Sequence, residues 1–158
     1  MKVVSDTSPI CYLLLIGEID LLPALYERIY IPQAVAAELR HPSAPSMLRS
    51  WMGNPPDWLE ILTVDSRVPL DLKRIQAGER EAILLTENLG ADLVILDDRR
   101  AREAALARGL VITGLLGVLG QAAKTGLISL HEVFGRLQQT SFRITSQALK
   151  NILDCHPR

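Results

Sequence analysis

Short apolar runs recur along this chain, and each is followed by polar residues and then by a stretch with helical spacing. The clearest runs cover residues 3–5, 28–31, 93–96 and 110–112. Apolar runs of this length predict fully buried strands, which belong mostly to parallel sheets. Repeated strand-then-helix units therefore predict an α/β fold, a mainly parallel sheet with helices on both faces. The carboxyl ends of such strands meet at one edge, where open α/β sheets bind ligands.

The remaining elements follow from apolar spacing and from Gly and Pro. Thr7 or Ser8 is expected to cap the first helix, and Trp51 falls on a short helix. Trp51 and Trp58 are expected to cover an edge of the core or an interface. One domain over 1–158 is predicted, with its core at about 2–130 and a helical C-terminal extension at about 127–158. Helices are predicted at 10–16, 18–27, 32–39, 78–87, 97–108, 115–124, 134–137 and 148–153, with an edge strand at 59–64.

The composition narrows the class of protein. The 158 residues are 48% hydrophobic and 22% charged, which favours one ordered domain with a sizeable core. With 17 basic and 18 acidic residues, a charged partner must meet a local patch rather than a global field. Cys11 and Cys155 have no metal-ligand spacing, so reduced thiols and a cytoplasmic location are expected. No apolar run approaches the roughly 20 residues of a membrane span.

Acidic residues follow two of the predicted strands directly. Asp6 comes after residues 3–5, and Asp97 and Asp98 come after residues 93–96. Like charges held close together raise each other's pKa, and a divalent cation removes that cost. The placement therefore predicts a metal site at the carboxyl edge of the sheet. The alternative is that each acid only caps or precedes a helix, although one acid is enough for that and the second strand supplies two.

Three further acids lie on predicted helices. Glu38 is the single acid in the small, apolar stretch 34–39, so it either points to the interior or faces solvent beside Arg40. Glu79 and Glu81 open the helix at 78–87, where the helix dipole favours acids in any case. Two residues on a helix point about 200° apart, so only one of this pair can face a shared pocket. Glu79 is preferred because it lies nearest the helix end, and Glu81 is the alternate.

The order of these motifs resembles the PIN-domain family, and in particular its toxin-type (VapC-like) subfamily of nucleic-acid-binding proteins. The similarity covers residues 2 to about 130 well, including 111–119 and 124–128, and 141–153 more loosely. The motifs are Asp6-Thr7-Ser8 after a strand, Pro32-x5-Glu38-Leu39, Gly78-Glu79-x-Glu81-Ala82-Ile83, and Leu96-Asp97-Asp98-x3-Arg102.

The resemblance implies a three-layer α/β/α sandwich and a Mg²⁺- or Mn²⁺-dependent endoribonuclease, a hydrolase of RNA phosphodiester bonds. It implies a cognate antitoxin protein and a homodimer as partners beside RNA. Asp98 is a further candidate ligand because this chain has a doublet, and Glu81 remains one because many relatives place Asp directly before the Ala. Thr7 and Ser8 would support the first acid. The implied acidic quartet is Asp6, Glu38, Glu79 and Asp97.

A basic stretch follows the second acidic motif. Arg99, Arg100 and Arg102 would place positive charge beside the acids, where RNA phosphates bind. The alternative is a solvated helix face with Glu103 as a local partner, or Arg102 pairing with one of the acids.

Other functions fit the sequence less well. A haloacid-dehalogenase-like phosphatase needs a second acid two residues after the first, where this chain has Ser8. The glycines at 114, 117 and 120 have no lysine at P-loop spacing. The three histidines are scattered outside the acidic motifs. A non-catalytic module that binds nucleic acid or protein on the same fold is the remaining alternative.

Overall fold

The computed structural model describes residues 1–65 and 67–142, and within them the strands form one fully parallel sheet. Its five strands are ordered β3-β2-β1-β4-β5. Val3 lies opposite Ile29 on one side and Leu93 on the other. The predicted parallel sheet is confirmed, and β3 lies at its edge as expected. The strands are β1 Val3–Ser5, β2 Ile29–Pro32, β3 Leu59–Leu62, β4 Leu93–Ile95 and β5 Ile112–Thr113.

Helices follow the strands as the strand-then-helix pattern predicts. They are α1 Thr7–Leu15, α2 Leu21–Tyr26, α3 Gln33–Arg40, α4 Ser46–Gly53, α5 Ala77–Leu89, α6 Arg99–Ala107, α7 Leu115–Lys124 and α8 Leu130–Leu137, with a 3₁₀ turn, η1, at Leu70–Leu72. The helix predicted at 115–124 is α7 without change, and the one predicted around 134–137 is the second half of α8. The stretch predicted at 148–153 lies outside the described residues.

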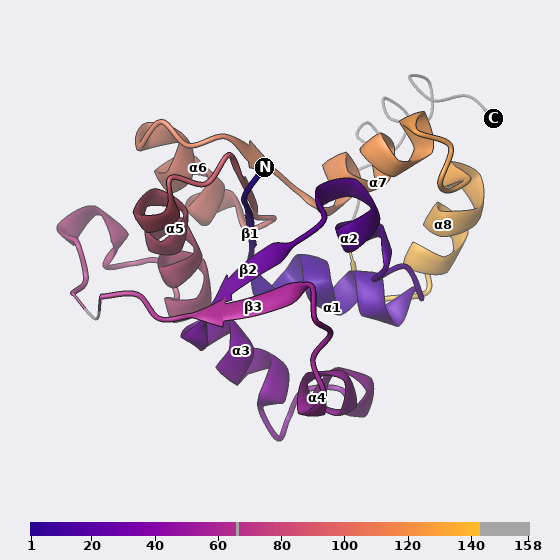
Figure 1. Cartoon of the computed structure of the whole chain (residues 1–158), viewed down its shortest axis with the longest axis horizontal. Helices are drawn as coiled ribbons and strands as arrows, with labels where there is room; N and C mark the ends of the chain where they lie inside the picture. The colour runs from indigo at the N-terminus through magenta and orange to yellow at the C-terminus, as the bar shows by residue number, and fades with distance from the viewer. Residues whose placement is uncertain (66, 143–158) are drawn as a thin grey trace.

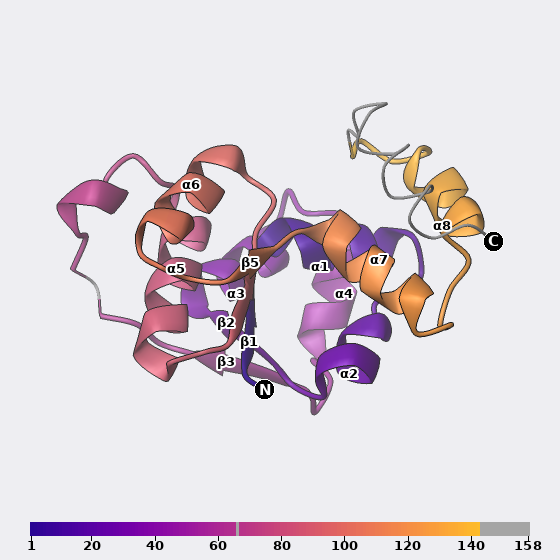
Figure 2. The ribbon, with the colours of Figure 1, turned by 90° about the horizontal axis from the view of Figure 1, so that it is seen from above.

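The two faces of the sheet carry separate apolar cores. In β1, Val3 packs into one cluster and Val4 into the other, because successive side chains on a strand point to opposite faces. The Val3 cluster is covered by α1, α2, α3, α4, α7 and α8, and the Val4 cluster by α5 and α6. Figures 1 and 2 show these two helical layers on either side of the strands. Each fully buried Val, Ile or Leu contributes about 1.5–3 kcal/mol of transfer free energy.

Two predictions about helix starts are wrong. The first helix begins at Thr7, and Asp6 occupies its N-cap position with no side-chain capping bond, so neither Thr7 nor Ser8 is the cap. The hydroxyl of Thr7 donates to Glu38 instead. In the helix predicted from 97, Asp98 is the N-cap and accepts the N–H of Ala101 at 3.0 Å.

The last strand begins later than predicted. The sequence predicts Leu110 in a strand over 110–112, but its N–H donates to the carbonyl of Ala105 in the turn that ends α6. Leu110 therefore belongs to the helix ending, and β5 covers only Ile112–Thr113.

The tryptophans cover an edge of the core, which is one of the two predicted places. Their ring centroids lie 5.8 Å apart, and both half-buried rings pack against the cluster that contains Val3. No helix in the described part of the chain is long and apolar enough to cross a membrane.

Candidate active site

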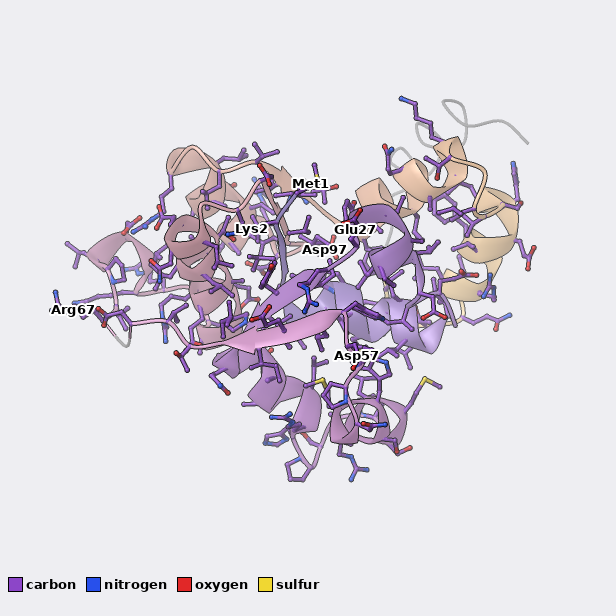
Figure 3. The ribbon with its side chains drawn as sticks, in the orientation of Figure 1. Met1, Lys2, Glu27, Asp57, Arg67 and Asp97 are labelled. Carbon is purple, nitrogen blue, oxygen red and sulfur yellow. The ribbon has the colours of Figure 1, made fainter. Side chains whose placement is uncertain are left out.

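Two strand ends bring the first acids together. Ser5 at the end of β1 pairs in register with Ile95 at the end of β4. The N–H of Asp6 donates to the carbonyl of Ile95 at 3.1 Å, so Asp6 is fixed beside the strand that leads into Asp97. Figure 3 labels Asp97 between the layer of α5 and α6 and the layer of α1 and α7. The shared edge predicted from the sequence is thus the place where these acids lie.

Asp6 is the most deeply buried acid of the group. Its side chain is 3% exposed, and its Oδ1 has no hydrogen-bond partner among residues 1–65 and 67–142. Burial and, to a smaller extent, the charges of Glu79, Glu38 and Asp97 raise the pKa of Asp6 to about 7, although the backbone amide of Thr7 offsets part of the rise. A buried carboxylate oxygen without a partner is costly. A bound cation would satisfy that oxygen and relieve the repulsion.

Glu38 reaches the same place from α3. The hydroxyl of Thr7, the residue after Asp6, donates to Glu38 Oε2. On its other side, a Cβ added to Gly78 would lie 2.5 Å from Glu38 Oε1, so only glycine leaves room for this carboxylate. Glu38 is therefore held between α1 and the start of α5, and the contact with Thr7 replaces the alternative pairing with Arg40.

Glu79 and Glu81 diverge, as their separation on the helix predicts. Burial raises the pKa of Glu79, and the charges of Asp98 and Glu38 raise it further. Glu81 Oε1 instead accepts the N–H of Ala34 in the first turn of α3, at 3.0 Å. The acid of this pair that shares the electrostatic environment of Asp6 is Glu79.

Asp97 is oriented by the start of α7. Its Oδ1 and Oδ2 accept the N–H of Leu115 at 3.0 and 3.3 Å. A Cβ on Gly114 would lie 2.4 Å from Asp97 Oδ1 and 2.8 Å from Arg102 Nη1. Burial raises the pKa of Asp97, while the Leu115 amide and the Arg102 charge lower it in part. Arg102 also donates from Nη1 to the carbonyl of Leu96 at 2.7 Å, which fixes it beside this acid.

The neighbouring candidates have separate roles. Asp98 caps α6, and its charge still raises the pKa of Glu79. Arg99 is exposed and pairs with Glu103 at 3.2 Å, which is the local pairing considered as the alternative. Arg100 is exposed to solvent.

Several groups that contact the acids are not among the site residues predicted from the sequence. The amides of Ala34 and Leu115 and the closely packed Gly78 and Gly114 belong to elements far from Asp6 along the chain. Among them only Gly78 stands beside a predicted acid. Side-chain support of the first acid by Thr7 was expected, whereas the Thr7 hydroxyl contacts the second acid, Glu38.

Within residues 1–65 and 67–142, no three Asp, Glu, His or Cys side chains form a ready metal-binding group. The hydrogen bonds above hold Glu38, Asp97, Asp98 and Glu81, while Asp6 keeps an unsatisfied oxygen. Mg²⁺ needs only one or two carboxylates, since waters and substrate phosphates complete its coordination. The unpartnered Asp6 oxygen and its carboxylate neighbours therefore fit a hard divalent cation.

The structure is an α/β protein whose parallel sheet carries carboxylates at its carboxyl edge, the edge at which open α/β sheets bind ligands. A family model described as a PIN domain (DUF3368) matches residues 2–156, so the chain belongs to the PIN-domain family. Comparison with curated proteins gives no match.

A solved structure supports the fold. The chain is similar to a PilT N-terminus domain protein from the hyperthermophilic archaeon Sulfolobus solfataricus P2, with a TM-score of 0.52 and 14% sequence identity, over 92% of this chain and 100% of the other. At that identity the likeness concerns the fold, and it confirms the predicted PIN-like α/β architecture. PIN domains are generally nucleases. Membership also makes the haloacid-dehalogenase-like alternative wrong.

Proposed function

We propose that this protein is a Mg²⁺- or Mn²⁺-dependent endoribonuclease whose acidic site is Asp6, Glu38, Glu79 and Asp97. The observation that supports it best is the unpartnered Oδ1 of buried Asp6, set among three carboxylates that raise its pKa. Family membership supports nuclease chemistry, and the oxygen-only donor set suits hard cations.

The side chains have distinct tasks in this proposal. Asp6 and Glu79 would hold the cation, while hydrogen bonds from Thr7 and Leu115 fix the carboxylates of Glu38 and Asp97. Asp98 is not assigned to the cation in this proposal, because its carboxylate already caps α6. A bound divalent ion activates water and neutralises the charge that grows on the leaving oxygen of a phosphodiester.

Positive charge next to the acids favours RNA as the substrate. Arg102 is fixed beside Asp97, and Arg100 is exposed on the same helix. Arg99 joins them when substrate binds, since its exposed pair with Glu103 contributes only about 0.3–0.5 kcal/mol.

The resemblance to toxin-type PIN proteins supports an antitoxin partner, a homodimer and a cytoplasmic location as parts of the same proposal. Co-expression with a small protein encoded by an adjacent gene tests the antitoxin proposal. That small protein should restore growth that expression of this chain alone arrests.

Asp97→Asn should reduce RNA cleavage by about 100-fold or more. The substitution keeps the shape and an acceptor for the Leu115 amide but removes the charge that a cation needs. Cleavage of several single-stranded RNAs in Mn²⁺ measures it, with chelator as a second control. Asp57→Asn is the matched variant, because Asp57 is an exposed acid just before β3, at the opposite end of the sheet.

Equal cleavage by wild type and Asp97→Asn contradicts the nuclease proposal. Metal-independent RNA binding without cleavage by the wild type favours the non-catalytic module instead, and fluorescence anisotropy with labelled RNA distinguishes that case.

Mn²⁺ affinity should rise by about tenfold per pH unit below pH 7 and level off above it. Asp6 has a pKa of about 7 without metal, so below that pH the cation must displace a proton from this carboxyl. The raised pKa values of Glu79 and Asp97 act in the same direction. Titration calorimetry at pH 5.5, 6.5, 7.5 and 8 measures the affinity, and a flat profile across this range rules out Asp6 as the group that competes with the metal.

A further inference from the structure

The start of α5 faces two neighbours at once. Glu79 shares the electrostatic environment of Asp6, whereas Glu81 contacts the backbone of α3. We propose that Glu81 is a positioning residue that fixes α3 against α5, and thereby places Glu38 relative to Glu79, rather than a metal ligand. The inference rests on the proposed function, because it concerns the same acidic site.

The Glu81 contact replaces a missing helix cap. The first four N–H groups of a helix have no partner within it, and acids near that end also complement its dipole. The N-cap residue of α3 is Pro32, which makes no side-chain capping bond. Glu81 Oε1 accepts the N–H of Ala34 at 3.0 Å from a different helix. A carboxylate from α5 thus satisfies an N-terminal donor of α3.

A second contact lies one helical turn along both helices. Ala34 and Glu38 are four residues apart, so they lie on the same face of α3. Gly78 and Glu81 are three residues apart and lie on the same face of α5. Glu81 meets Ala34, and Gly78 lies so near the Glu38 carboxylate that an added Cβ would be 2.5 Å from Oε1. The two faces are therefore in register at two points.

This register determines where two acids of the site lie. Glu38 sits on the contacting face of α3, and Glu79 follows Gly78 directly on α5. A shift of α3 along α5 moves Glu38 relative to Glu79 while leaving Asp6 at the end of β1.

Three variants test the proposal. Glu81→Gln keeps an oxygen acceptor for the Ala34 amide without the charge, Glu81→Ala removes the acceptor, and Glu79→Gln removes the charge of a proposed ligand. We expect Mn²⁺ affinity within about threefold of wild type for Glu81→Gln. For Glu81→Ala we expect a loss of 10–100-fold, the usual range for groups that orient ligands. Glu79→Gln should lose at least as much.

Amide hydrogen exchange without metal gives an independent measurement. The Ala34 N–H should stay protected in Glu81→Gln and exchange at least tenfold faster in Glu81→Ala. Asp71→Ala is the control for general destabilisation, because it removes a hydrogen-bonded ion pair between Asp71 and Arg108 that does not touch the acidic site. It should leave Mn²⁺ affinity unchanged.

Two results overturn the inference. One is a loss of Mn²⁺ affinity in Glu81→Gln as large as in Glu79→Gln, which would make Glu81 a ligand. The other is an Ala34 amide that exchanges equally fast in wild type, Glu81→Gln and Glu81→Ala. If wild type binds no Mn²⁺, the proposed function fails by itself, and the exchange of the Ala34 amide still decides whether Glu81 holds α3.

Discussion

Asp6→Asn should raise the melting temperature of the metal-free protein at pH 8 by several degrees and abolish its stabilisation by Mn²⁺. These opposite effects have one cause. Asp6 is buried among like charges, and its Oδ1 has no hydrogen-bond partner in the described part of the chain, so the ionised carboxylate destabilises the fold until a cation binds. Asparagine has the same shape without the charge.

The sign follows from the pKa of Asp6. The carboxyl has a pKa of about 7 in the folded protein against an ordinary value of 3.8, so the folded state holds the proton more tightly than the unfolded chain. The stabilisation by the bound proton is complete below the unfolded pKa and is lost as pH rises through 7. At pH 8 the difference is at most about 4 kcal/mol, at 1.36 kcal/mol per pKa unit. The advantage of Asp6→Asn should shrink between pH 8 and pH 5.

Thermal unfolding with and without Mn²⁺ measures both effects. A cation at 100 times its dissociation constant stabilises the wild type by about 2.7 kcal/mol. For a chain of this size that is roughly 5–10 °C in melting temperature. Asp57→Asn, an exposed acid at the other end of the sheet, should keep the full shift with Mn²⁺. If Asp6→Asn melts below wild type at pH 8 without metal, Asp6 is a structural group and the metal site lies elsewhere.

The sequence predicts that Asp6 and Asp97 lie together at one edge of the sheet, because their placement depends on strand order alone. A short apolar run followed by an acid is a local pattern, and parallel pairing then brings the carboxyl ends of β1 and β4 together. The directions of the Glu38 and Glu79 side chains are harder to predict, since each depends on which face of its helix packs inward. The 200° separation of Glu79 and Glu81 predicted that only one faces the other acids, and the Ala34 contact shows where the other points.

The groups that orient the acids could not be predicted. The amides of Ala34 and Leu115 have no side-chain signature, and every residue except proline carries one. Their use depends on how α3 packs against α5 and where α7 begins relative to Asp97. Thr7 illustrates the same limit: a helix cap was the local expectation, but a carboxylate from α3 is the partner that tertiary packing supplies.

Gly114→Ala should reduce RNA cleavage by about 100-fold or more while the protein stays folded. A Cβ at this position would lie 2.4 Å from Asp97 Oδ1 and 2.8 Å from Arg102 Nη1. The φ of Gly114 is −125°, which alanine adopts without strain, so the whole cost falls on these two side chains. Asp97 is short and bonded to Leu115, so it cannot move aside and keep its orientation.

Overpacking of this kind costs typically 1–3 kcal/mol, a few degrees in melting temperature, and leaves most of the fold intact. Gly135→Ala is the matched control, since Gly135 lies in α8 with nothing within 4 Å of an added Cβ. That change should stabilise the helix by about 0.5–1 kcal/mol and leave cleavage unchanged. Mn²⁺ affinity, melting temperature and cleavage rate are compared in both variants. Wild-type cleavage by Gly114→Ala would mean that the reaction does not need Asp97 in its observed orientation, because the added methyl group must displace that carboxylate as well as the arginine beside it.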